Sequence, residues 1–252
     1  AAIISDVNEQ PGALPLLQYT LTELFEQREQ NIITLEAYQA NGSVFGALAN
    51  RAEEIYNNLD PTQKQFTKQL FLRLVTLGEG TEDTRRRVEH SELFSTKVNN
   101  NALQHVLDIF GQHRLLTFDH DPSTRIPTVE IAHEALISTW DRLRTWINLS
   151  RDDLRLHRRL TTISTEWANA ENDASFLATG ARLEQVENWL ASTNIFLNEN
   201  EMNFINASIA QRKQQKREIE RRQVWEETLE WRSRVRLWAL VFLMFIAAIG
   251  AF

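Results

Sequence analysis

A His–Glu pair at a change of sequence period is the stretch best suited to chemistry. Val129 and Ile131 alternate with more polar or smaller neighbours, which is the period of a half-buried strand. The apolar residues after the pair recur at steps of four, three and four, as on one helix face: Leu136, Trp140, Leu143 and Ile147. The pattern predicts a strand running into a helix, with His133 and Glu134 at the helix N-terminus. Free backbone N–H groups and the helix dipole favour an anion there.

Zinc coordination and local hydrogen bonding are two other interpretations of His133. The segment begins like the HExxH motif of zinc proteases, but Ile137 stands where the second histidine ligand is required. Two-histidine zinc coordination on one helix face is therefore excluded. A histidine that only makes local hydrogen bonds at a strand–helix junction stays open as an alternative.

Two further groups of residues are candidates for contacts. Pro15 falls in the first turn of a predicted helix, where its missing N–H has no cost. Arg85, Arg86 and Arg87 form the densest cationic cluster outside the C-terminal arm. Adjacent guanidinium groups repel one another, so they either face water along an edge strand or meet phosphates or carboxylates.

Several kinds of catalytic site are absent from the sequence. It has no GxxxxGK[ST] phosphate loop and no apolar strand ending in an acidic residue that would hold magnesium. The six histidines are scattered, no serine lies on a nucleophile elbow, and there is no cysteine. By itself, the chain is not expected to be an ATPase.

Charge is distributed unevenly along the 252 residues. The formal net charge is −7, yet residues 211–236 carry nine Lys or Arg against five Asp or Glu. The rest of the chain is therefore acidic, which argues against broad nucleic-acid binding. The start, AAIISDVNEQ, has neither Met nor a signal-peptide pattern and suggests a fragment of a longer chain.

Helical periodicity dominates the remaining sequence. Amphipathic stripes predict three helices in a small lid bundle over 11–28, 35–42 and 43–59. Further helices follow at 60–77, where Asp60 and Gln63 predict a capping box, and at 91–94 and 101–111, before a hairpin with strands at 114–118 and 128–131. This is the element order of a winged helix. The expected recognition helix offers only Arg114 near its end, so we do not expect DNA binding through it.

The last helices lead into an apolar run. Helices are predicted over 152–170 and 181–192, and a capping box at Asn198 and Glu201 opens a long helix that runs to the end. Residues 237–252 contain no charge, and tryptophans and arginines precede them, as at a cytoplasmic membrane interface. We expect membrane insertion; the alternative is packing against downstream repeats in the same protein.

These motifs resemble a known family. VEIAHEALISTWDRLRTWI, together with LRLHRRLTTISTEW and FLATGARL, resembles the STAND signal-transduction ATPases, and more narrowly the bacterial novel STAND group, which often continues into WD-type repeats. The resemblance implies that His133 contacts bound ADP, although Ala132 and Glu134 stand where the family has Met and Asp. Similarly, GALPL resembles a motif whose proline packs near the adenine, which would be Pro15. The segment from Thr84 to Val88 also resembles one found in the group, without an assigned role.

The expected fold class is mainly α, divided into five regions. These are a helical lid over 1–59, a winged-helix domain with a short β-hairpin over 60–150, a helical extension over 151–196, a basic linker helix over 197–236 and a truncated transmembrane helix over 237–252.

The expected function follows from the resemblance. The chain would be the nucleotide-sensing, regulatory part of a STAND ATPase, with ATP or ADP and Mg²⁺ held mainly by an upstream domain. Its partners would be that domain, a downstream repeat domain, a membrane at its cytoplasmic face and possible further copies of the protein, without nucleic acid. The main alternative is a membrane-anchored helical scaffold or adaptor that binds no nucleotide, and a winged-helix transcription factor is the third.

Overall fold

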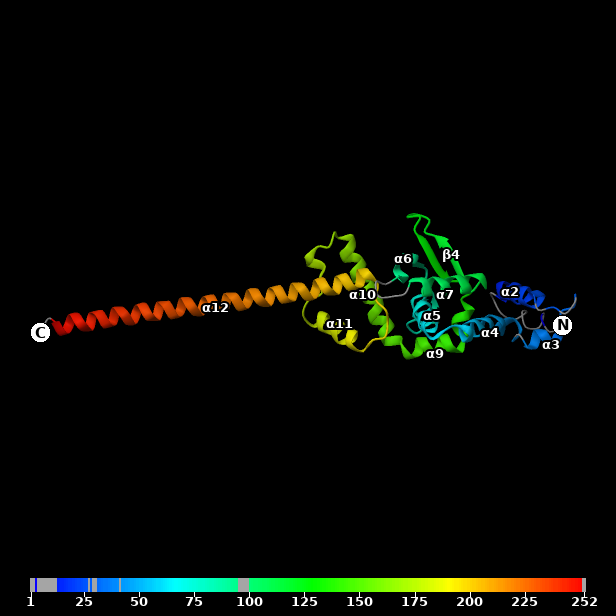
Figure 1. The fold of residues 1–252 in the computed structure, drawn as a ribbon, viewed down its shortest axis with the longest axis horizontal. Helices are drawn as coiled ribbons and strands as arrows, with labels where there is room; N and C mark the ends of the chain where they lie inside the picture. The colour runs from blue at the N-terminus through cyan, green and yellow to red at the C-terminus, as the bar shows by residue number, and fades with distance from the viewer. Residues whose placement is uncertain are drawn as a thin grey trace.

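The computed structural model describes residues 3, 13–26, 28, 31–40, 42–94 and 100–250. The described chain is mainly helical with two small antiparallel sheets. Figure 1 shows α2 and α3 at one end, a body of short helices and strands in the middle, and one long helix, α12, extending from the other end. The expectation of a mainly α chain is confirmed.

The first three helices form a small bundle, as predicted. They are α2 (Ala13–Glu26), α3 (Leu35–Ala40) and α4 (Ser43–Asn58). Residues 11, 12 and 27 of the helix expected over 11–28 lie outside the described residues. The hydroxyl of Thr20 donates to the carbonyl of Val44 at 3.2 Å, and the Arg51 guanidinium pairs with the Glu23 carboxylate. Both contacts fix α2 against α4 while leaving one apolar face of α2 uncovered.

The next segment contains helices and a three-stranded sheet. In chain order its elements are α5 (Pro61–Arg73), β1 (Val75–Thr76), β2 (Thr84–Arg85), β3 (Val88–Glu89), α6 (His90–Leu93), α7 (Asn100–Gln112), β4 (Leu116–His120) and β5 (Pro127–Ile131). The predicted capping box at Asp60 is present, and the predicted hairpin is β4–β5, with Leu116 opposite Ile131. Strand β3 pairs with β5, giving the order β3–β5–β4. The sequence did not predict the short strands β1 and β3, whereas β2 overlaps the edge strand considered for the arginines from Arg85 to Arg87.

The helix expected after His133 is in fact two helices, α8 (Ala135–Thr139) and α9 (Asp141–Leu149). Trp140 separates them with an extended backbone (φ −83°, ψ 99°). The break lets its indole Nε1 donate to Glu53 Oε2 at 2.9 Å while its ring packs edge-on against Phe71. The predicted buried face was nevertheless right, because Leu136, Trp140, Leu143 and Ile147 are all buried.

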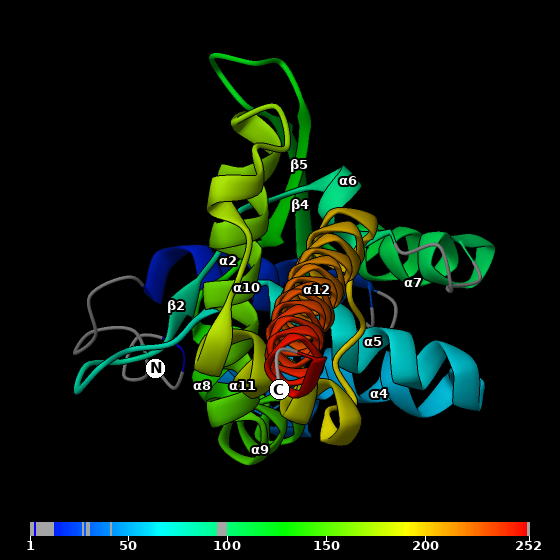
Figure 2. The ribbon, with the colours of Figure 1, turned by 90° about the vertical axis from the view of Figure 1, so that its left-hand side faces the viewer.

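The C-terminal half consists of α10 (Arg151–Asn169), the 3₁₀ turn η1 (Ala174–Phe176), α11 (Gly180–Ser192) and α12 (Glu199–Gly250). Helix α12 packs its first turns on α10 and α11, and Figure 2 looks almost along its axis, with the body arranged around it. The linker and apolar helices expected over 197–236 and 237–252 form one continuous helix, with residues 251 and 252 outside the described range. Across the described ranges, no helix has an apolar stretch long enough to cross a membrane.

Trp140 should carry a large share of the stability of the body. Replacing it with alanine removes a 2 % exposed indole and leaves a cavity beside Phe71, so Trp140→Ala should lower the free energy of unfolding by about 3–5 kcal/mol. Urea denaturation of the chain measures this change. Leu149→Ala is the matched control, because Leu149 is 79 % exposed and its loss should change stability by less than about 0.5 kcal/mol.

Candidate functional site

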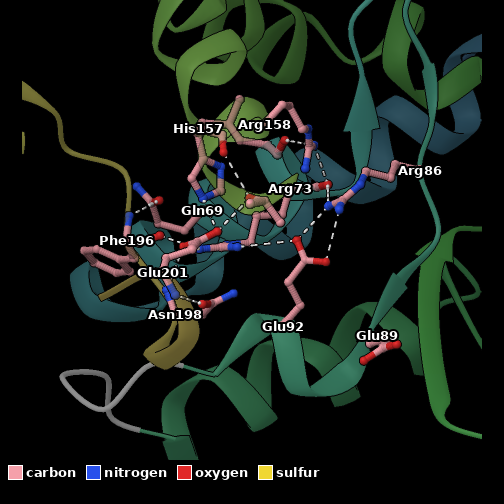
Figure 3. A network of polar contacts seen from close by, with 12 residues as sticks. Gln69, Arg73, Arg86, Glu89, Glu92, His157, Arg158, Phe196, Asn198 and Glu201 are labelled. Atoms are coloured by element: carbon pink, nitrogen blue, oxygen red, sulfur yellow. Dashed lines mark hydrogen bonds and ion pairs between the residues drawn. The ribbon is translucent and has the colours of Figure 1, made fainter. Parts of the chain in front are cut away.

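A buried polar cluster joins the first turn of α12 to the central body. Figure 3 shows its members coming from α5, the segment around α6, α10, the connector that leads from α11 into α12, and the first turn of α12. Its charged side chains are Arg73, Arg86, Glu92, Arg158 and Glu201, with His157 between them. We refer to this set as the junction cluster.

The carboxylate of Glu201 is the centre of the junction cluster. Its side chain is fully buried, and its Oε2 accepts the backbone N–H of Asn198 at 2.9 Å, as the predicted capping box requires. Its Oε1 accepts the hydroxyl of Thr161 at 2.6 Å and lies 3.0 Å from Nε2 of His157. Burial alone would raise the pKa of Glu201, but His157, the Arg73 guanidinium and the Thr161 hydroxyl together lower it to about 2. The carboxylate is therefore charged at neutral pH.

His157 is a buried neutral histidine. Burial lowers its pKa, and the positive charges of Arg73 and Arg158 act in the same direction, against the opposite effect of Glu201. We assign the proton to Nε2, because that nitrogen faces the carboxylate of Glu201. The other face of the ring stacks on Trp189 of α11, with centroids 6.2 Å apart. His157 thus holds α10, α11 and α12 together at one point.

Arg73 connects the two carboxylates of the cluster. It is 4 % exposed, its Nη2 lies 3.6 Å from Glu201 Oε2 and its Nη1 lies 3.6 Å from Glu92 Oε1. The same Nη2 donates to the carbonyl of Phe196 in the connector. Glu92 also accepts two hydrogen bonds from Arg86, at 2.7 and 3.1 Å. Bidentate pairing of this kind fixes direction as well as distance.

Arg158 closes the C-terminal end of α5. Its Nη2 donates to the carbonyls of Arg73 at 2.7 Å and Val75 at 2.6 Å. The last carbonyls of a helix lack partners within the helix, and a cation there also complements the dipole. Burial lowers the pKa of Arg158 to about 9, and repulsion from Arg86 and Arg73 adds to the effect.

Backbone contacts hold the connector before α12 in the same place. Gln69 of α5 donates from Nε2 to the carbonyl of Asn194 at 2.9 Å and accepts from the N–H of Phe196 at 3.0 Å. Beside these contacts lies a cleft of about 1300 Å³ between the sheet, α10 and the start of α12, lined by Arg86, Arg158 and Thr161 among others. One side of the junction cluster therefore borders an open cleft.

His133 lies at a second contact, between the lid bundle and the central body. Its ring meets Tyr19 of α2 edge-on, with centroids 5.7 Å apart. Burial lowers the pKa of His133, and the nearby charge of Arg85 lowers it further, so the imidazole is neutral at pH 7. The helix that follows is only five residues long, and Glu134 accepts the backbone N–H of Arg85 at 3.2 Å. The neutral ring of His133 is therefore placed as a contact between α2 and β2.

The other predicted site residues lie apart from His133 or have carboxylate partners. Pro15 is exposed in the first turn of α2, one turn before Tyr19. Arg85 and Arg87 lie near Glu130, at 3.8 and 3.1 Å, while Arg86 pairs with Glu92 in the junction cluster. Both environments expected for the arginines are present, because Arg85 lies in the exposed strand β2 and all three arginines have carboxylates nearby. A phosphate contact for them stays a prediction.

The sequence indicated two features of the junction cluster: the Asn198–Glu201 capping box and Arg86, as a candidate for contacts with phosphates or carboxylates. Gln69, Arg73, His157 and Arg158 lie in amphipathic helices, where their polarity is compatible with a solvent-facing position. Their partners are up to 127 residues away in the chain, and no local periodicity connects such positions. A histidine next to the apolar stripe of α10 was the one available signal, and it was not used.

Comparison with known proteins agrees with the motifs. The family model described as Novel STAND NTPase 1 matches residues 1–175, which is more than half of the chain. The chain belongs to this family. The match includes His133, α10 and the body side of the junction cluster, and it ends before α11. No curated protein and no solved structure matches the chain.

Membership of the Novel STAND NTPase 1 family implies a nucleotide and Mg²⁺, so the fit of the described residues to these groups can be tested. No group of three or more metal-ligating side chains occurs within the described ranges. His133 is half-buried and neutral, and it suits a hydrogen bond to a phosphate or ribose but offers no compensating charge. Among the described residues, His133 is therefore the candidate for a hydrogen bond to such a nucleotide.

Removing the central carboxylate should destabilise the chain strongly. Glu201→Ala leaves the buried Arg73 with only one of its two carboxylates and removes the cap of α12, so the free energy of unfolding should fall by about 3–5 kcal/mol. Urea denaturation measures the change. Glu199→Ala is the control, because Glu199 is an exposed acidic residue of the same turn. An equal loss in both variants would contradict the role of the junction cluster.

The neutral state of His157 predicts a particular pH dependence. Because its pKa is lowered on folding, the unfolded chain binds more protons below its usual value of 6.5, and stability falls as pH falls. His157→Gln retains a donor toward Glu201 but cannot titrate. Between pH 7 and pH 5 its unfolding free energy should therefore fall less steeply, by up to about 1.4 kcal/mol per pH unit. His90 and His133, whose pKa values burial also lowers, should keep the remaining slope in both proteins.

Proposed function

We propose that this chain is the regulatory relay of a STAND NTPase, which transmits the state of a bound nucleotide to the helix α12 and to whatever follows it. The observation that carries the proposal is the burial of Glu201, a charged residue of α12, inside contacts made by α5 and α10. A displacement of the body relative to α12 would leave that charge unpaired. The junction cluster therefore favours discrete positions of α12 over gradual ones.

The input side of the relay would be the contact between the lid bundle and the central body. His133 and Tyr19 meet there, and Glu53 of α4 accepts from Trp140 and Arg142 across the same boundary. In the intact protein, we infer that ADP or ATP with Mg²⁺ binds mainly to an upstream domain. His133 would then contact the nucleotide from this side, and Pro15 would lie near the base.

An uncovered apolar surface on α2 supports the presence of an upstream partner. It forms a groove of about 540 Å³ lined by the residues Leu14, Leu17, Gln18, Leu21, Thr22, Phe25 and Ile33. Leu14 is 72 % exposed and Phe25 is 56 % exposed. A contiguous apolar surface of this kind is typical of an interaction site. We propose that the nucleotide-binding domain of the same protein covers it.

The finer parts of the architecture belong to the same proposal. The order α5, β3, α6, α7, β4, β5, with β3 paired to β5, supports a winged-helix domain over 60–150. Association of the C-terminal end with the cytoplasmic face of a membrane and a downstream repeat domain stay predictions. A membrane-anchored adaptor that binds no nucleotide is the alternative function, and nucleotide binding by the intact protein distinguishes the two.

The relay is tested on the intact protein by replacing His133. His133→Ala should release ADP about tenfold faster and raise basal signalling, which corresponds to a coupling of about 1–3 kcal/mol. Nucleotide dissociation is followed with a fluorescent ADP analogue. His120→Ala, at an exposed position in the β4–β5 hairpin, is the control and should behave as the wild type. Unchanged ADP release in His133→Ala would contradict the nucleotide contact.

The output side has its own measurement. Hydrogen exchange of residues 196–210 in the intact protein should differ between the ADP-bound state and a state with a non-hydrolysable ATP analogue. Glu201→Gln should reduce this difference while leaving ADP affinity within about twofold, because it removes the buried charge far from the nucleotide. Identical exchange in the two nucleotide states of the wild type would contradict the relay.

A further inference from the structure

The distal part of α12 has no partner within the described chain. Helix α12 is 52 residues long, and every described side chain over 213–235 is exposed. Figure 1 shows this part extending away from the body. Its exposed residues nevertheless include large apolar side chains, among them Trp231 at 67 % and Trp238 at 72 %. Large apolar side chains are not needed to form a helix, and several of them on a water-facing surface indicate an interaction site.

Four of the exposed apolar side chains, together with Thr228, follow a seven-residue repeat. Val224, Thr228, Trp231, Val235 and Trp238 recur at steps of four, three, four and three. A repeat of 3.5 residues is the spacing at which two helices bury one continuous seam by coiling around each other. From Val224 to Trp238 the seam would span about 21 Å of helix, at 1.5 Å per residue.

Charges on the two flanks of this stripe are complementary between parallel copies. Glu227 precedes the seam residue Thr228 on one flank, and Arg232 follows the seam residue Trp231 on the other. In a parallel pair in register, a flank residue such as Glu227 faces the residue five places later in the partner helix. Glu227 of each chain would therefore meet Arg232 of the other. Within the described ranges, neither side chain forms an ion pair in its own chain, whereas Arg234 already pairs with Glu230.

Thr228 is compatible with a buried seam. Its hydroxyl donates to the carbonyl of Trp225 at 2.7 Å in its own helix. Burial against a partner helix would therefore leave no unsatisfied donor at this position. A lone polar residue in an otherwise apolar seam also helps to fix the register of the two helices.

We propose that α12 pairs with α12 of a second copy of this chain, as a parallel coiled coil that begins at Val224. A membrane surface is a poorer occupant of the stripe over 224–232, because Glu226, Glu227 and Glu230 lie among the apolar residues and anionic lipids repel them. In an antiparallel pair, the flank with Glu227 would face the same flank of the partner helix, so Glu227 would no longer meet Arg232.

Cysteine cross-linking of the whole chain tests the pairing directly, because the sequence has no cysteine. Thr228→Cys places a thiol in the seam, and Ser233→Cys places one on the outer face of the same helix. The two positions are matched: both are exposed in the single chain, and both hydroxyls donate to a backbone carbonyl of their own helix. Under mild oxidation, Thr228→Cys should form a disulfide-linked species of twice 29.3 kDa at least about tenfold faster than Ser233→Cys. Equal rates would overturn the proposal.

Charge exchange then tests direction and register. Glu227→Arg alone and Arg232→Glu alone each set like charges against one another twice per pair, so the dissociation constant in sedimentation equilibrium should rise about tenfold. The double variant Glu227→Arg with Arg232→Glu restores both pairs and should return the constant to near its original value. Failure of the double variant to recover would overturn the parallel arrangement.

A third experiment distinguishes pairing with a second copy from binding to a lipid surface. The wild-type chain and Thr228→Cys are each mixed with vesicles of phosphatidylcholine and phosphatidylserine; vesicle binding is measured for the wild type and cross-linking for Thr228→Cys. The proposal expects cross-linking with or without vesicles. Binding to vesicles together with loss of the Thr228→Cys cross-link in their absence would assign the stripe to the membrane and overturn the pairing.

Discussion

A fully buried carboxylate on the first turn of α12 sets the strongest constraint on this structure. Removing the charge of Glu201 from water costs several kcal/mol, and the cost is offset only when its partners are all in place. Those partners come from α5, α10 and the connector before α12. Such a site is satisfied in one arrangement and strongly penalised in arrangements that are slightly shifted. It therefore fixes the direction in which α12 leaves the body.

The opposite end of the body is held by contacts of a different kind. Between the lid bundle and α8–α9, the aromatic rings of Tyr56, Trp140 and Trp146 pack edge-on, and the polar contact of Glu53 lies at the rim. Aromatic packing tolerates small rotations that a buried ion pair does not. A displacement of the lid bundle is therefore either absorbed by these aromatic contacts or transmitted through α5. Helix α5 contributes Phe71 to the aromatic contacts and Arg73 to the junction cluster.

The separation in sequence between interacting residues explains which features the sequence predicted. Helix positions, the Asp60 and Asn198 caps and the β4–β5 hairpin depend on neighbours within a few residues, and local spacing indicated all of them. The break at Trp140 depends on Glu53, which is 87 residues away, and the pattern of apolar residues is the same with or without it. The junction cluster likewise combines positions that are remote in the chain. His133 was selected from the change of sequence period and from a family motif, and its contact with a nucleotide stays a prediction.

Helix α12 connects the junction cluster at Glu201 to the apolar stripe that begins at Val224. A helix that is uninterrupted from Glu199 to Gly250 is a stiff element, so a rotation imposed at Glu201 is carried to Val224 and beyond. In a parallel pair, both helices start from bodies fixed at the same angle to the seam. The seam then resists rotation of either body, because turning one helix by a single position moves Trp231 out of it and exposes it to water. Two copies joined in this way would share one setting of their junction clusters, which makes the orientation of each body depend on the state of the other.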